Sequence, residues 1–154
     1  MNKNVLWSHK SDEWTTPQYL FDQLNDEFGF DLDPCSTKEN HKCDMFYTAE
    51  QDGLKQSWGG YRAFCNPPYS QIAKWVEKAY HEGQKENTIV VLLIPARTDT
   101  RYFHNYIYGK SEIRFIKGRL KFGDSKYNAP FPSMIVVFRG KETRGIRWWE
   151  RLKQ

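Results

Sequence analysis

The run of residues 88–94 constrains the fold more than any other feature of the sequence. From Ile89 to Ile94 every side chain is apolar and either β-branched or a leucine. A short apolar run without polar alternation is typical of a central strand that is covered on both faces, as in parallel sheets. Such a strand needs helices above and below its sheet. The run therefore predicts an α/β domain with a mostly parallel sheet.

Helix and strand patterns alternate along the rest of the chain, which supports the same fold class. A first helix is expected to follow a threonine cap and Pro17 and to end at Gly29, and a second is expected between a Ser70 cap and Gly83. A third helical stretch covers residues 100–108. The remaining expected elements are strands at 30–33, 61–65, 112–116 and 133–138 and an extended hairpin or loop at 118–132.

Length and composition fit a single globular domain. The chain has 154 residues, of which 39% are hydrophobic and 27% charged, and we expect a core over about residues 12–139 with a basic tail over 140–154. Its longest apolar runs are far shorter than the roughly 20 residues of a membrane span, and the N-terminus lacks a secretory pattern. Cys35, Cys43 and Cys65 have no paired spacing, so we expect neither disulfides nor a zinc site. A soluble cytoplasmic protein is expected.

Charge is divided unevenly along the chain. The net charge is +4, but residues 11–52 carry eleven acidic and two basic side chains, whereas residues 97–154 carry fourteen basic and five acidic ones. A basic half favours a polyanionic partner, and a mixed, solvated surface after folding is an equal alternative. Aromatic residues make up 16% of the chain, more than a core of this size needs, so some could stack against bases.

The segment Asn66-Pro67-Pro68-Tyr69 is the sharpest chemical signal. It follows a predicted strand and precedes a predicted helix, and ligands of open α/β sheets bind at the carboxyl ends of strands. The two prolines hold the backbone rigid, so the Asn66 side chain and nearby carbonyl groups offer hydrogen-bond acceptors beside an aromatic ring. These groups suit a planar substrate that carries an amino group. A strand-ending turn with a packed tyrosine is the structural alternative.

The order of several short motifs adds to this signal. They are Trp14-Thr15-Thr16-Pro17, Asp33-Pro34-Cys35-Ser36, Asp52-Gly53-Leu54, Asn66-Pro67-Pro68-Tyr69, an apolar strand ending at Pro95, Gly118-Arg119-Leu120 and Pro132-Ser133. In this order they resemble the small, phage-type DNA N6-adenine methyltransferase family over residues 12–139. The resemblance implies a compact, abbreviated Rossmann-like fold, S-adenosylmethionine as the methyl donor and double-stranded DNA as the substrate. It also places the chain among bacteriophage and restriction-modification methyltransferases.

The resemblance implies roles for individual residues. The expected catalytic residues are Asn66, Pro67, Pro68 and Tyr69. The Asn66 oxygen and the Pro67 carbonyl would accept the two N–H bonds of the adenine amino group, and Tyr69 would stack on the flipped base. The expected cofactor-binding residues are Thr15, Thr16, Pro17, Asp33, Pro34, Cys35, Asp52 and Asn66. The usual glycine-rich loop is absent after Asp33, and only residues 34–65 lie between Asp33 and Asn66, which indicates a shortened first half.

The basic half is expected to hold the DNA. The expected phosphate contacts are Arg97, Arg101, Arg119, Lys121 and Lys126, and each could equally be a solvated charge. No metal is expected. Two alternatives stay open: a methyltransferase with the same loop that acts on RNA or on a protein glutamine, and a non-catalytic DNA-binding or decoy protein on the same scaffold. A phage-encoded chain would act in the cytoplasm of the bacterial host.

Overall fold

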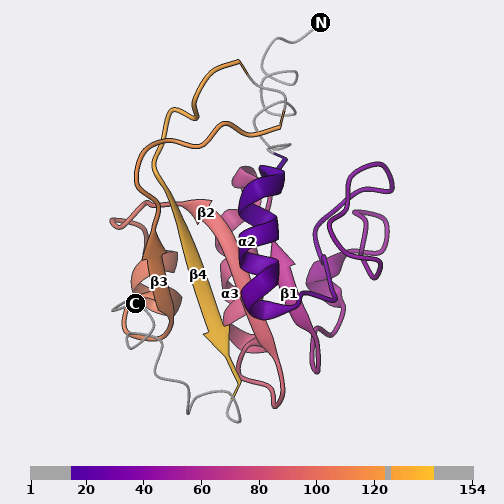
Figure 1. The fold of residues 1–154 in the computed structure, drawn as a ribbon. Coiled ribbons are helices and arrows are strands. Elements are labelled where there is room, and N and C mark those ends of the chain that lie inside the picture. Colours follow the sequence, from indigo (N-terminus) through magenta and orange to yellow (C-terminus); the bar gives the residue numbers. More distant parts are fainter. Residues whose placement is uncertain (1–14, 124–125, 141–154) are drawn as a thin grey trace, which may run out of the picture.

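A four-stranded sheet forms the centre of the protein (Figure 1). The computed structural model describes residues 15–123 and 126–140. The strands are β1 (Arg62–Cys65), β2 (Ile89–Pro95), β3 (Glu112–Phe115) and β4 (Ser133–Arg139), and their order across the sheet is β1-β2-β4-β3. All four coincide with strands that the sequence predicts, and the α/β class is confirmed.

The sheet is mixed, so the prediction of a mostly parallel sheet is wrong. β1 and β2 run parallel, whereas β4 runs antiparallel to both of its neighbours, β2 and β3. β3 and β4 are joined by a loop without a crossover helix, and strands joined in this way pair antiparallel. β4 then lies between β3 and β2, where Ser133 pairs with Pro95 and Arg139 pairs with Ile89.

The predicted strand at 30–33 is reduced to isolated bridges. Leu32 pairs in parallel with Ala63 of β1, and Asp33 pairs in parallel with Phe46. These pairings place the residues that follow Asp33 beside the carboxyl end of β1. The first part of the chain therefore reaches the sheet through single contacts instead of a continuous ladder.

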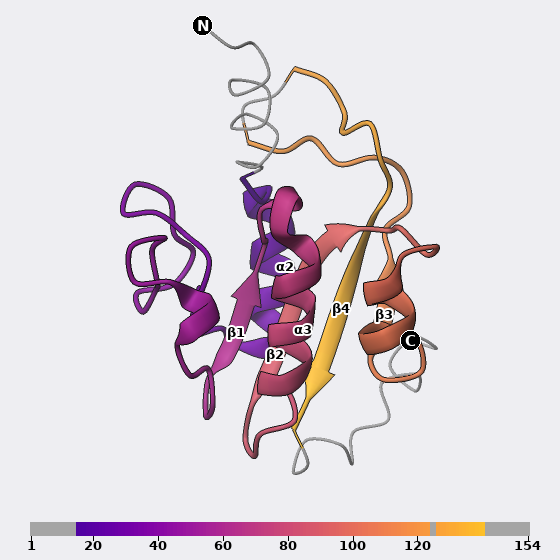
Figure 2. The same cartoon turned by 180° about the vertical axis from the view of Figure 1, so that it is seen from behind.

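Helices cover both faces of the sheet (Figures 1 and 2). On one face lies α2 (Gln18–Phe28), whose Phe21, Leu24 and Phe28 join Ile89, Val91 and Leu93 of β2. On the other face lie α3 (Ile72–Glu82) and the short π-helical segment η3 (Phe103–Ile107), which pack against Val90, Leu92 and Ile94. Alternate side chains of β2 thus enter opposite layers, which explains why this strand is apolar throughout.

The helix ends differ in part from the prediction. Gly29 ends α2 in the left-handed conformation (φ 65°), as predicted, and Gly83 follows the last residue of α3. The predicted caps are wrong. Pro17 occupies the N-cap of α2, and Ser70 lies inside a 3₁₀ turn, η2 (Tyr69–Gln71), that leads into α3. The Thr16 hydroxyl is engaged by a distant segment of the chain, so it does not cap the helix.

Residues 116–132 connect β3 to β4, and we call them the arm. The predicted hairpin or loop is confirmed, because the arm extends away from the sheet and returns (Figure 1). The Ala129 N–H donates to the Leu120 carbonyl at 2.7 Å across the two halves of the arm. Leu120, Phe122 and Ala129 are buried in the α2 side of the core and anchor it. Within the described ranges, no helix is long and apolar enough to cross a membrane.

Candidate active site

Several loops meet at the edge of the sheet where β1 and β2 end and β4 begins (Figure 1). We call it the carboxyl edge. β1 continues directly into Asn66, and β2 continues into Arg97 through a single residue. The arm leaves from the same place, because the Ile116 N–H donates to the Ser133 carbonyl at 3.1 Å. In open α/β sheets this is the edge at which ligands bind.

The Asn66 side chain is held by a buried threonine. Its Nδ2 atom donates a hydrogen bond to Thr16 Oγ1 at 3.0 Å, and Thr16 is only 4% exposed. The other amide atom, Oδ1, is shielded from solvent. The backbone that follows is also well defined, since Pro67 is buried and Pro68 is extended (φ −64°, ψ 136°) before Tyr69 starts η2. An acceptor oxygen therefore has a defined place at the carboxyl edge.

Tyr69 presents a partly buried ring beside the arm. The ring meets Phe131 edge to face, with 5.1 Å between the ring centres. Burial raises the pKa of the Tyr69 hydroxyl above its ordinary value, while the positive charge of Arg97 acts in the opposite direction. Tyr69 is therefore neutral at physiological pH and offers a ring and a hydroxyl to a ligand. Three segments meet here: the Asn66–Tyr69 loop, the end of β2 and the arm.

Asp33 organises the loop that follows its bridge to Phe46. The side chain is 5% exposed, Oδ2 accepts from the Lys42 backbone N–H at 2.9 Å, and Oδ1 accepts from the Cys35 backbone N–H at 3.4 Å. Burial raises the pKa of Asp33 to about 6, and the two backbone hydrogen bonds oppose this rise. The predicted cofactor residue thus holds its own loop in shape.

The other predicted cofactor-binding residues in the first half of the chain lie near the end of β1. The Cys35 thiol lies against the Cys65 thiol, and burial raises the pKa of Cys65. The Pro34 carbonyl packs so closely on Gly53 that a Cβ at residue 53 would lie 2.0 Å from the Pro34 oxygen. Asp52 caps the 3₁₀ turn η1 (Gly53–Lys55) by accepting a backbone hydrogen bond at 3.1 Å.

Residues 15–17 connect three parts of the site. The Thr15 carbonyl accepts from the Gly123 N–H of the arm at 2.9 Å, and Thr15 Oγ1 accepts from Asn40 Nδ2 at 2.9 Å. Thr16 holds Asn66, and the buried Pro17 accepts the first backbone bonds of α2. The structure thus brings this predicted segment against the Asn66 loop. Trp14, which begins the motif, lies outside the described residues.

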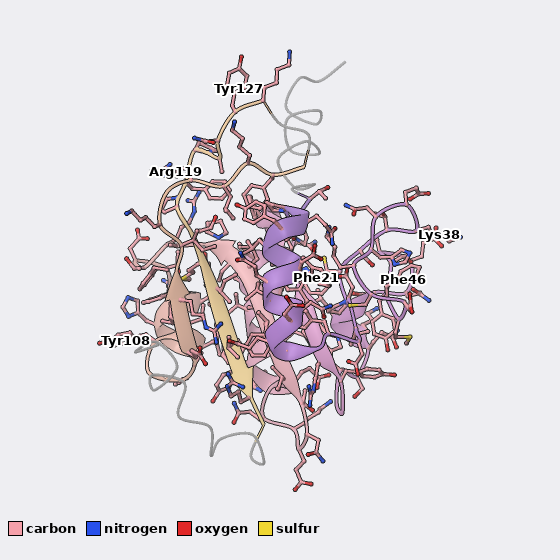
Figure 3. All side chains as sticks on the ribbon, viewed as in Figure 1. Phe21, Lys38, Phe46, Tyr108, Arg119 and Tyr127 are labelled. Atoms are coloured by element: carbon pink, nitrogen blue, oxygen red, sulfur yellow. The ribbon has the colours of Figure 1, made fainter. Side chains whose placement is uncertain are left out.

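The predicted DNA contacts fall into two groups. Arg119, Lys121 and Lys126 are exposed along the arm, and Figure 3 shows Arg119 on it. Arg97 is exposed close to Tyr69, and Arg101 is exposed just before η3. Most of the basic tail, with Trp148 and Trp149, lies outside the described residues. Nowhere in residues 15–123 or 126–140 do three His, Cys, Asp or Glu side chains form a group that could hold a metal ion.

Sequence reasoning missed two aromatic residues of the arm. Tyr127 is 79% exposed next to Lys126, and Figure 3 shows it toward the outer end of the arm. Phe131 packs on Tyr69 and on Phe122, which lies 6.1 Å away between ring centres. The signal was aromatic residues inside a basic segment between two strands, a composition that suits contact with nucleic acid.

Comparisons with known proteins identify the family. A sequence profile described as DNA N-6-adenine-methyltransferase (Dam) matches residues 3–149. The DNA N-6-adenine-methyltransferase of Haemophilus phage HP1 is 31% identical over 153 residues, which cover 94% of this chain and 88% of that protein. The protein of the same description from Escherichia phage T1 is 35% identical over 111 residues, covering 71% of this chain and 46% of that protein. The resemblance of the motifs is confirmed: the chain belongs to the DNA N-6-adenine-methyltransferase (Dam) family.

Proposed function

We propose that the protein transfers a methyl group from S-adenosylmethionine to the N6 amino group of adenine in DNA. The observation that carries this proposal is the Asn66–Tyr69 loop at the carboxyl edge, with the Asn66 amide held by Thr16 at 3.0 Å. Membership of the DNA N-6-adenine-methyltransferase family supports it. The relatives from two bacteriophages support a reaction in the cytoplasm of a bacterial host.

The Asn66–Tyr69 loop would make the adenine amino group of the substrate more reactive. An adenine amino group is a weak nucleophile, because its lone pair is delocalised into the ring. Asn66 Oδ1 and the Pro67 carbonyl would accept its two N–H bonds, which raises the electron density on nitrogen and orients its lone pair. The protein then acts by position and by dipoles, and no covalent bond to a side chain is needed.

The residues around the loop suit S-adenosylmethionine, which supplies an electrophilic methyl group when bound. The cofactor carries positive charge on its sulfonium and ammonium groups, and anionic surroundings favour both. Asp33 and Asp52 lie in segments that pack together through Pro34 and Gly53 beside β1. We assign cofactor binding to Thr15, Pro17, residues 33–35, Asp52 and Asn66. Asp33 contributes its negative charge and the shape of its loop, since both of its oxygens already accept backbone hydrogen bonds.

Tyr69 would receive the flipped base. An amino group inside a duplex is out of reach, so the base must leave the stack at a cost of a few kcal/mol. The edge-to-face contact with Phe131 fixes the plane of the Tyr69 ring, and a ring held in place is a good stacking surface for adenine. Arg97, whose charge acts on the Tyr69 hydroxyl, would hold a neighbouring phosphate. Arg101 and the basic residues of the arm would contact phosphates further along the duplex.

The proposal is tested by methyl transfer from tritiated S-adenosylmethionine to duplex DNA, to RNA and to protein extract. We expect N6-methyladenine in DNA. In the same assay Asn66→Ala should lower turnover by about 10²–10³-fold, because one polar group aimed at the transition state is lost. Asn66→Asp keeps an oxygen in a similar place and should retain more activity than Asn66→Ala. Tyr69→Phe should be mild and Tyr69→Ala severe, since stacking needs the ring and not the hydroxyl.

Each variant must be shown to be folded by circular dichroism and to bind S-adenosylmethionine by calorimetry. Label in RNA or in protein, and none in DNA, would establish one of the alternative methyltransferases instead. Binding of DNA without any transfer would establish a decoy. An Asn66→Ala enzyme with unreduced turnover would show that the loop is only a turn.

A further inference from the structure

We infer that Thr16 is a positioning residue that orients the Asn66 amide so that Oδ1, and not Nδ2, faces the substrate. This inference rests on the proposed function, since it specifies how the Asn66 acceptor is held. It also changes the role expected for Thr16, which the sequence assigns to the cofactor pocket.

The inference starts from the symmetry of an amide side chain. The two ends of an asparagine amide have nearly the same shape, but one accepts hydrogen bonds and the other donates them. If Nδ2 faced the adenine amino group, two donors would oppose each other and the nucleophile would not be held. The Nδ2–Thr16 Oγ1 hydrogen bond at 3.0 Å occupies the donor end. Asn66 Oδ1 therefore lies at the other end of the planar amide, directed away from Thr16.

The Thr16 hydroxyl does not form a capping hydrogen bond with α2, the helix that follows it. A threonine at this place is expected to cap α2, but Pro17 occupies the N-cap and α2 has no side-chain cap hydrogen bond. The hydroxyl instead reaches across 50 residues of sequence to Asn66. A capping role therefore does not account for the buried hydroxyl of Thr16.

Neighbouring bonds fix the position of Thr16 itself. On one side, the Thr15 carbonyl accepts from Gly123 of the arm, and Thr15 Oγ1 accepts from Asn40, both at 2.9 Å. On the other side, Pro17 accepts from the Leu20 N–H at 3.1 Å as α2 begins. Thr16 is also buried, at 4% exposure. A group that orients a reacting partner is effective only when its own position is held in this way.

The test compares Thr16→Val, Thr16→Ser and Thr48→Val. Thr16→Val keeps the shape and removes the hydroxyl, so kcat on duplex DNA should fall about 3- to 10-fold, the usual effect of one lost hydrogen bond. Calorimetry should show an unchanged Kd for S-adenosylmethionine. Thr16→Ser keeps the hydroxyl and should restore most of kcat. Thr48→Val makes the same chemical change outside the site and should leave kcat unaltered.

A double-mutant cycle separates positioning from general structural damage. In the Asn66→Ala background there is no amide to orient, so adding Thr16→Val should have no further effect on kcat. A fall of equal size in both backgrounds would overturn the inference. So would a raised Kd for S-adenosylmethionine with unchanged kcat, which would return Thr16 to the cofactor pocket.

A readout without catalysis distinguishes failure of this inference from failure of the proposed function. The Asn66 side-chain amide protons can be followed by ¹⁵N NMR in the cofactor-free protein. Their hydrogen exchange should be at least several-fold faster in Thr16→Val than in the parent and in Thr16→Ser. Unchanged exchange would refute the orienting bond whatever the substrate is. An inactive parent that shows the expected exchange difference would refute the proposed function and keep the bond.

Discussion

Asp33 is a buried carboxylate whose two backbone hydrogen bonds only partly offset the loss of water. Burial raises its pKa from 3.8 to about 6, and the hydrogen bonds from Lys42 and Cys35 oppose this rise. The folded protein therefore holds the Asp33 proton more tightly than the unfolded chain does. Between these two pKa values the folded state binds more protons, so Asp33 reduces the free energy of unfolding as the pH rises.

We expect Asp33→Asn to remove this pH dependence. The free energy of unfolding of the parent, minus that of the variant, should fall by up to about 3 kcal/mol in total as the pH rises from about 3 to about 8, most steeply between the two pKa values, and should be constant above that range. Urea unfolding of both proteins across this pH range measures it. The variant also places an amide group against the Lys42 N–H. The free-energy cost of that contact is the same at every pH, so it does not alter how the difference between the two proteins changes with pH. A difference that is flat, or that grows with pH, would contradict the prediction.

Thr16 shows which properties of single residues sequence can predict. Its position just before the first helix follows from the local pattern, because proline and the following helix restrict the backbone. Its partner does not follow, since a bond to Asn66 depends on how α2 lies across the sheet. Local capping preference was outweighed by a tertiary hydrogen bond. The same reason applies to Phe131, which meets Tyr69 only once the arm has folded back.

At the scale of elements, η1 packs so closely on the loop after Asp33 that residue 53 has no room for a side chain. A Cβ on residue 53 would lie 2.0 Å from the Pro34 carbonyl oxygen and 3.1 Å from Trp75 Cη2. We expect Gly53→Ala to lower the free energy of unfolding by about 1–3 kcal/mol, as overpacking does. Because the strain moves Pro34, the affinity for S-adenosylmethionine should fall as well. Urea unfolding and calorimetry measure the two effects.

Gly59→Ala is the matched control for this change. A Cβ at residue 59 would meet mainly the movable Lys85 side chain, at 3.0 Å. The control should therefore lose less stability and should bind S-adenosylmethionine like the parent. If Gly53→Ala and Gly59→Ala had the same free energy of unfolding and the same affinity for S-adenosylmethionine, the close approach of residue 53 to Pro34 would affect neither quantity.

The elements themselves were predictable where the pattern is local. The apolar run of β2 and the apolar faces of α2 and α3 reflect burial on one or both sides, which periodicity reports directly. The direction of β4 was not predictable in this way. Its residues are buried along nearly the whole strand, as parallel strands often are, and the antiparallel pairing comes from the arm that returns the chain to the same edge.

At the scale of the whole molecule, the arm concentrates positive charge next to the carboxyl edge. If it holds phosphates, the affinity for duplex DNA should fall with salt by a log–log slope of about −0.9 for each contact. Arg119→Glu combined with Lys121→Glu should weaken binding to all sequences alike and should make the slope shallower by about 2. Fluorescence anisotropy at several salt concentrations measures both.

The control carries the same change of charge elsewhere. Lys55→Glu combined with Lys110→Glu alters two exposed lysines, one in η1 and one ahead of β3. This variant should keep most of the DNA affinity and the parent slope, and both variants should bind S-adenosylmethionine normally. Equal losses in the two double variants would mean that net charge, and not the arm, governs the affinity.

The position of β4 between β2 and β3 also determines when the sheet can be completed during synthesis on the ribosome. β2 is the most apolar strand, and its pairing with β4 joins residues far apart in the sequence. At about 5–20 residues per second, synthesis takes roughly 2–8 seconds to pass from Pro95 to Ser133. During that time one edge of β2 lacks its partner in the nascent chain, and an apolar open edge invites aggregation. The carboxyl edge with Asn66 is therefore completed only once β4 has been synthesised and has closed the centre of the sheet.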